Sequence, residues 1–144
     1  MRTIAQAALL ALALTTQHAW AETILNDRML HEECGWDSHA SMRDCLARKA
    51  HETETWLRNA QAAALAAIDN WDEDARYRRE SKRRFRAAER AFATYRATYC
   101  AFSASLGGGA AGGAHEMGRL GCVAILNSQH TAQLRSEVID LPLK

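Results

Sequence analysis

Thiol chemistry is the first possibility that this sequence raises, because its four cysteines are widely spaced in a short chain. They are Cys34, Cys45, Cys100 and Cys122. No two of them form a C-x-x-C pair, the spacing typical of zinc and redox motifs. If the chain is exported, an even number of cysteines predicts two disulfides, and three pairings are compatible with four cysteines.

The other residues that could do chemistry do not form a recognisable site. The histidines beyond the N-terminal leader are His31, His39, His51, His115 and His130. None belongs to an H-E-x-x-H motif or to another metal-ligand spacing. The sequence has no G-x-S-x-G motif, and oxidised cysteines leave no evident nucleophile. We therefore predict a protein that is not an enzyme, with no catalytic residues, no metal and no cofactor.

The first 21 residues have the features of a secretory signal peptide. Arg2 is followed by an apolar run over residues 4–14 and by Ala19-Trp20-Ala21, a small-x-small cleavage site. The apolar run is too short for a transmembrane anchor. No cysteine lies at the cleavage point, so the sequence does not indicate a lipoprotein. We predict cleavage after Ala21 and a periplasmic or secreted protein without a membrane span.

Cleavage would leave residues 22–144, which we predict to form a single domain with a small core. Without Arg2 the mature chain has 17 basic and 17 acidic residues. A neutral chain argues against a dedicated nucleic-acid-binding protein, since such domains carry a basic excess.

The elements that must position these residues are helices. Residues 41–70 and a second run ending where Gly107 begins repeat their apolar positions every three or four residues, the period of an α-helix face. A third helix is expected over about residues 115–139. Residues 22–39 read as irregular, with one turn of helix around residues 28–33. The predicted fold is all-α: an antiparallel hairpin of two helices, each about 45–50 Å long, completed by the third as a three-helix bundle.

The expected hairpin brings all four cysteines to one end of the bundle, beside a glycine-rich connection. Seven of the eight glycines lie between Cys100 and Cys122. A disulfide between these two cysteines would close that connection and contribute roughly 3 kcal/mol. The segment is then either a plain linker or an exposed binding loop held at its base. The candidate loop residues are Gly107, Gly108, Gly109, Gly112, Gly113, His115 and Glu116.

Two further features concern the second predicted helix. Its aromatic residues Phe92, Tyr95, Tyr99 and Phe102 occupy adjacent helical rows, so most of them should be buried. Its first half carries a run of basic residues: Arg76, Arg78, Arg79, Lys82, Arg83, Arg84, Arg86 and Arg90. Such a run is usually a solvated face, but it could also bind an anionic surface polymer of the cell envelope.

The cysteine spacing and the motifs around it resemble the lysozyme inhibitor LprI-like family, over about residues 34–138. The matching elements are Cys34, Met42-Arg43-Asp44-Cys45-Leu46, the segment from Glu89 to Cys100, the Gly107-Gly108-Gly109 loop and Cys122. Members of this family typically show M-x-x-C at the start of one helix and Q-x-x-W-x-x-Y/F-R-x-x-x-C on the next. The family-motif residues here are Met42, Glu89, Phe92, Tyr95 and Arg96. Glu89 replaces the usual Gln, and Phe92 replaces the usual Trp.

The resemblance implies a pairing and a function. It favours the disulfides Cys34–Cys45 and Cys100–Cys122. It implies an exported bacterial binding protein that inhibits lysozyme and so protects the cell wall, with lysozyme or another wall-degrading enzyme as its partner. Lysozymes are generally basic, so the arginine run should face away from such a partner. For Arg96, a bond to carbonyls or a carboxylate near the cysteines is the expected role, in preference to direct contact with a ligand.

Overall fold

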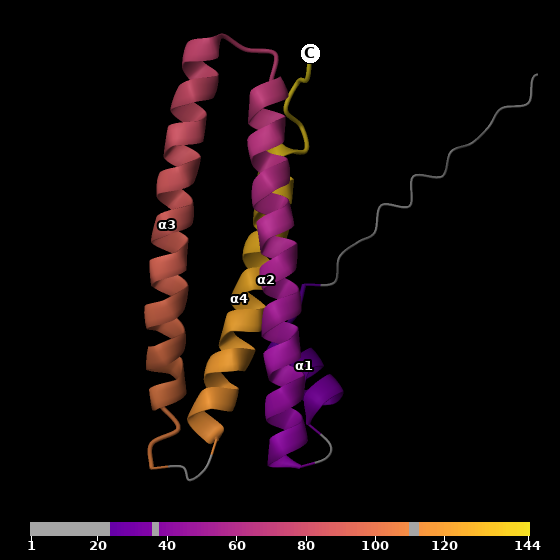
Figure 1. The fold of residues 1–144 in the computed structure, drawn as a ribbon, viewed down its shortest axis with the longest axis vertical. Helices are drawn as coiled ribbons and strands as arrows, with labels where there is room; N and C mark the ends of the chain where they lie inside the picture. The colour runs from indigo at the N-terminus through magenta and orange to yellow at the C-terminus, as the bar shows by residue number, and fades with distance from the viewer. Residues whose placement is uncertain (1–23, 36–37, 110–112) are drawn as a thin grey trace, which may run out of the picture.

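Four α-helices make up the fold in the computed structural model, which describes residues 24–35, 38–109 and 113–144. They are α1 (Asp27–Cys34), α2 (His39–Asn70), α3 (Ala75–Ser105) and α4 (Ala114–Val138) (Figure 1). No strand occurs in these ranges, and the only pairing of that kind is an isolated bridge between Trp71 and Leu143. The predicted signal peptide and Gly112 lie outside the described residues.

The first helix, α1, corrects the three-helix prediction to a four-helix fold. Asn26 caps it by accepting a hydrogen bond from the backbone nitrogen of Met29 at 3.0 Å. Leu30 and Cys34, four residues apart, are both buried. Two inward positions are too few for a recognisable periodicity, so the helix depends on packing and on its disulfide to α2 rather than on an evident sequence pattern.

Helix α2 begins at His39, two residues before the predicted start at residue 41. Ser38 and Ser41 form a reciprocal capping box, in which each side chain binds the backbone of the other. The buried row of α2 consists of Leu46, Ala50, Thr53, Leu57, Ala60, Ala64 and Ile68.

Helix α4 is the centre of the bundle. Figure 1 shows α2 and α3 antiparallel, with α4 behind them and between them. Helix α2 packs mainly on α4, and α3 also packs more on α4 than on α2. Ala60 and Ala64 of α2 and Ala124 of α4 are almost completely buried. Small side chains at these positions let the helix axes approach closely.

The inward face of α3 is rotated relative to the expected one, and the prediction that its aromatic residues are mostly buried is wrong. From Phe92, which is half-buried, the inward row continues through Arg96 and Cys100. Tyr95, Tyr99 and Phe102 are 50%, 43% and 59% exposed. The rotation follows from two requirements, because Cys100 must reach α4 to form its disulfide and the arginine must reach its partners inside the bundle.

Candidate functional site

Both disulfides lie at one end of the bundle, which we call the cysteine pole. The bonds are Cys34–Cys45, with Cα atoms 5.6 Å apart, and Cys100–Cys122, with Cα atoms 5.5 Å apart. This is the predicted pairing, and it is confirmed. The first turns of α2 and α4 and the last turn of α3 meet at this pole (Figure 1). The disulfides therefore tie α1 to α2 and α3 to α4.

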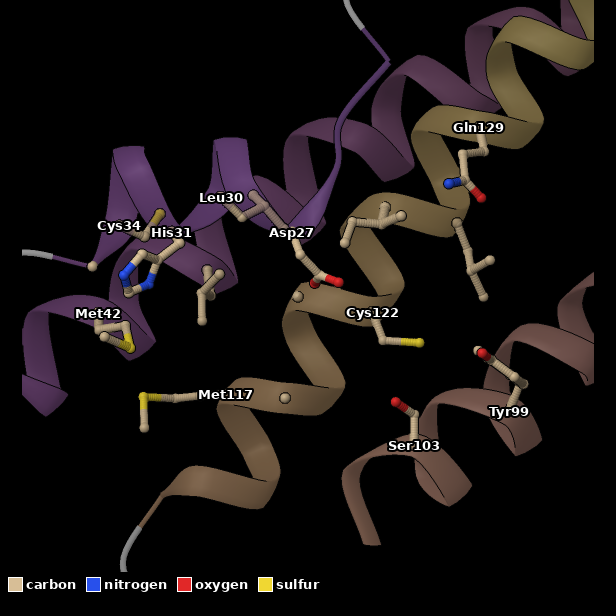
Figure 2. Close-up of a pocket in the computed structure, with 16 residues that line it drawn as sticks. Asp27, Leu30, His31, Cys34, Met42, Tyr99, Ser103, Met117, Cys122 and Gln129 are labelled. Carbon is tan, nitrogen blue, oxygen red and sulfur yellow. The ribbon is translucent and has the colours of Figure 1, made fainter. Parts of the chain in front are cut away.

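An open groove of about 490 Å³ runs over the N-terminal half of α4 at this pole. Figure 2 shows Asp27, His31 and Cys34 of α1 on one side of α4, and Tyr99 and Ser103 of α3 on the other. Sulfur atoms, aliphatic carbons and a few polar groups line it, the mixture typical of a binding surface.

The floor of the groove is formed by α4 where the helix carries its glycines. A Cβ atom added to Gly118 would lie 3.8 Å from the Cα of Ala104 in α3. One added to Gly121 would lie 3.8 Å from a methyl group of Leu30 in α1. A Cβ atom at either position would therefore make an ordinary van der Waals contact, which shows that α3 passes close to α4 at Gly118 and α1 at Gly121.

An exposed aromatic row borders the groove on α3. It consists of Tyr95, Tyr99, Phe102 and Leu106, and all four are exposed. The Tyr95 and Tyr99 rings stack with centroids 5.3 Å apart, and Phe102 meets Tyr99 at 6.4 Å. The row leads from the middle of α3 to the glycine-rich connection. It forms a continuous apolar surface of a kind that often marks a protein interface.

The glycine-rich connection is held at both of its described ends. Gly108 has a φ of 60°, a backbone conformation that favours glycine. The Nε2 atom of His115 lies 2.8 Å from the carbonyl oxygen of Gly108. Glu116 binds Arg119 one turn later at 2.7 Å. This bond lowers the pKa of the Glu116 carboxyl and raises that of the Arg119 guanidinium. His115 and Glu116 thus have local partners next to the connection.

A polar cluster inside the bundle binds three helices together, and Arg96 is at its centre. Its guanidinium donates to Glu54 of α2 at 2.5 Å and also to the side-chain oxygen of Asn127 in α4. Asn127 is completely buried and donates in turn to Glu54 at 3.2 Å. The expectation that Arg96 binds a carboxylate is confirmed, although the pair lies nearer the middle of the bundle than the cysteines.

Glu89 and Phe92 extend the same cluster one to two turns away. Glu89 accepts a hydrogen bond from Gln61 of α2 at 2.6 Å and lies 2.9 Å from Nε2 of His130 in α4. Phe92 stacks on the His130 ring with centroids 3.9 Å apart. The inward residues of the α3 motif therefore hold α3 against α2 and α4, whereas Tyr95 of the same motif faces solvent.

Sequence reasoning did not find the partners of these motif residues. Glu54, Gln61 and His130 lie 28 to 42 residues from the groups they bind. One signal was present, because the polar Asn127, which binds Arg96 and Glu54, interrupts the apolar row of the last helix. A polar residue at an inward position requires a partner, since an unpaired buried polar group is costly.

The described part of the chain carries two surfaces suited to binding, the groove and the exposed aromatic row. Within those ranges, no three His, Cys, Asp or Glu side chains are arranged to hold a metal ion. None of the described helices combines the length and the apolar character that crossing a membrane requires. Met42 is half-buried and lines the groove. It packs against a buried apolar cluster at the cysteine pole that includes Leu30 and Leu46.

Comparison with known proteins gives one family. A family model described as "Lysozyme inhibitor LprI" matches residues 32–134. This range runs from the end of α1 to near the end of α4 and contains both disulfides and the polar cluster. The comparisons with curated proteins and with solved structures found no match.

Proposed function

The chain belongs to the LprI lysozyme inhibitor family, and on this premise we propose that it is an exported protein that inhibits lysozyme. The family match over residues 32–134 is the observation that carries the proposal. The family is one of inhibitors rather than of catalysts, so the action expected of this chain is binding.

Export is part of the proposal and has two supports. Disulfides form and persist outside the reducing cytosol, and this chain has two with no free cysteine among its described residues. The N-terminal sequence has the pattern of a signal peptide, with cleavage proposed after Ala21. The mature protein, proposed to be a single domain over residues 22–144, would then meet lysozyme in the periplasm or outside the cell.

We assign the lysozyme contact to the cysteine pole, with the aromatic row as its anchor. Tyrosine is among the residues that contribute most to protein interfaces, and phenylalanine is enriched in them. Tyr95, Tyr99 and Phe102 are held on a helix that a disulfide ties to α4, so they lose little freedom on binding. The connection from Gly107 to Gly113, whose two ends are joined by the contact of His115 with Gly108, would extend this contact.

Charge supports the same assignment. Lysozymes are generally basic, and several cations of the pole are neutralised by acids. Lys49 binds Glu33 at 2.5 Å, a hydrogen bond that raises the pKa of the lysine, and Arg119 binds Glu116. Asp27, on the edge of the groove, forms no ion pair with any residue that the structure describes. The arginine run lies towards the opposite end of α3.

The test is the clearing of cell-wall suspensions by lysozyme in the presence of the oxidised mature protein. We expect Tyr95→Ala with Phe102→Ala to weaken inhibition by about tenfold or more, the effect of losing interface anchors. Tyr77→Ala is the matched control, since this tyrosine is 48% exposed on the same helix, far from the pole. Shortening the chain between Gly107 and Gly113 tests the loop separately.

The outcomes separate the function from the surface. If a large molar excess of the protein has no effect on several lysozyme types and other wall-degrading enzymes, the inhibitor proposal is wrong. If the protein inhibits but the aromatic variants and the shortened loop inhibit equally well, the function holds and the assignment to the cysteine pole is wrong.

A further inference from the structure

The first half of α3 carries five arginines in one line along the helix. We call them the arginine row: Arg76, Arg79, Arg83, Arg86 and Arg90. Their spacing of three, four, three and four residues puts them on one side of the helix. All five are exposed, and at 1.5 Å per residue the row is about 20 Å long. It begins at the end of α3 opposite the cysteine pole (Figure 1).

The positive charge of this row is only partly compensated. Glu80 binds Arg83 at 2.7 Å and also Arg84 at 2.7 Å, so one carboxylate serves two cations. Both arginines lower the pKa of Glu80. Arg79, Arg86 and Arg90 form no ion pair within the ranges that the structure describes. A solvated salt-bridge face would alternate its charges, whereas this row presents a surplus of one sign.

A shallow pocket beside the row adds an aromatic surface to the cations. Arg76, Tyr77, Arg79, Glu80 and Arg83 line it, and its volume is about 410 Å³. The guanidinium carbon of Arg76 lies 5.1 Å from the centroid of the Tyr77 ring, which is half exposed. Arginine binds sulfate, phosphate and carboxylate groups through two parallel hydrogen bonds. A neighbouring tyrosine face offers a sugar ring a surface to stack on.

We propose that the arginine row binds a linear anionic glycan, a sugar chain that carries sulfate, phosphate or carboxylate groups at regular intervals. A row about 20 Å long can contact acid groups on several successive sugars, and Tyr77 contacts a ring between them. A glycan suits this chain better than a nucleic acid, because a disulfide-bonded protein works outside the cytosol, where acidic glycans are the common polyanions. This activity goes beyond lysozyme inhibition and uses the other end of the molecule.

The test measures binding of fluorescent heparin, a sulfated glycan, by anisotropy over a series of salt concentrations. The triple variant Arg79→Gln, Arg86→Gln, Arg90→Gln removes three exposed cations of the row. The matched control, Arg43→Gln, Arg48→Gln, Arg58→Gln, removes three exposed arginines of α2 and changes the net charge equally. All six side chains are on the surface, so both variants should keep the wild-type circular dichroism and thermal midpoint.

We expect the row variant to bind heparin at least tenfold more weakly, while the control changes affinity less than about threefold. The slope of log affinity against log salt should fall by about two in the row variant, since each lost contact releases fewer counterions. Tyr77→Ala should weaken heparin binding but leave binding of inorganic polyphosphate, which has no sugar, unchanged. Inhibition of lysozyme should be the same in the row variant as in the wild type.

Three results would overturn the proposal. The first is that the row variant and the α2 control lose affinity equally, since binding would then depend on net charge alone. The second is that the wild type does not bind heparin at about 150 mM salt, where a specific site should survive screening. The third is that a DNA duplex binds the row as tightly as heparin does, since the surface would then recognise nucleic acid rather than glycan.

Discussion

Arg96→Met should destabilise the protein by about 3 kcal/mol. The arginine donates to the Glu54 carboxylate at 2.5 Å and to Asn127, and its side chain is only 19% exposed. Removing one partner of a buried ion pair costs about 3–5 kcal/mol, because the other charge remains buried. Glu54 keeps 33% of its exposure, so water can partly solvate the carboxylate, and we expect the lower end of that range.

The measurement is urea unfolding followed by circular dichroism, with the disulfides intact. Arg90→Met is the control, since it makes the same chemical change on the exposed side of the same helix and should cost less than about 0.5 kcal/mol. A double-mutant cycle with Glu54→Gln should give a coupling energy of about 1.5–2 kcal/mol, within the range for residues in direct contact. The reasoning is refuted if Arg96→Met costs no more than Arg90→Met, or if the coupling energy is near zero.

Three further predictions concern stability. Phe92→Ala should cost about 2 kcal/mol in urea unfolding, less than truncation of a fully buried aromatic residue, because the ring is half-buried and stacked in the polar cluster. The control Phe102→Ala, at an exposed ring, should cost under about 0.5 kcal/mol. Equal losses in the two variants would contradict the rotation of α3. Replacing both Cys100 and Cys122 by Ser opens a loop of 22 residues and should cost about 3 kcal/mol; an unchanged urea midpoint would contradict this. The pKa of Glu116 is lowered in the folded state, so its ion pair stabilises the fold above the unfolded pKa of about 4.3 and that contribution is lost as pH falls through the folded value. Glu116→Gln should therefore lower stability by under about 1 kcal/mol at neutral pH and by nothing at the acid end of a pH series; a difference that grows in acid would be the wrong sign.

The helices themselves could be predicted because their signals are local. Glycine after α3 and helix-forming composition in α2 place the ends of these helices within a few residues of the observed ones, at Ser105 and Asn70. The disulfide pairing was implied by family resemblance, not by spacing. Helix α1 was underestimated because its stability depends on burying Leu30 and Cys34 against other elements, which no local pattern reports.

The rotation of α3 was missed for a different reason. Its aromatic row repeats every three to four residues as an inward face would, and ranking residues by hydrophobicity therefore selects Tyr95 and Phe102 over Arg96. In the structure the arginine faces inward because the Glu54 carboxylate of α2 and the Asn127 amide of α4 lie within hydrogen-bond distance of its guanidinium. Partners that distant in sequence can be inferred only from the polar interruptions on their own helices, such as Asn127. Burial of a charged residue is decided by its partners rather than by its type.

The two disulfides have a consequence for how the chain is divided. Each joins neighbouring helices, α1 to α2 and α3 to α4, so the backbone over residues 71–74 is the covalent link between the two halves in the described structure. The most extensive packing, between α2 and α4, crosses this division, and so does the bond from Arg96 to Glu54. A single cut in that exposed turn would therefore yield two internally cross-linked pieces, held together without a covalent bond by helix packing and by polar contacts such as that of Arg96 with Glu54. The single chain is therefore built from two disulfide-linked helix pairs, α1 with α2 and α3 with α4, that one short stretch of backbone connects.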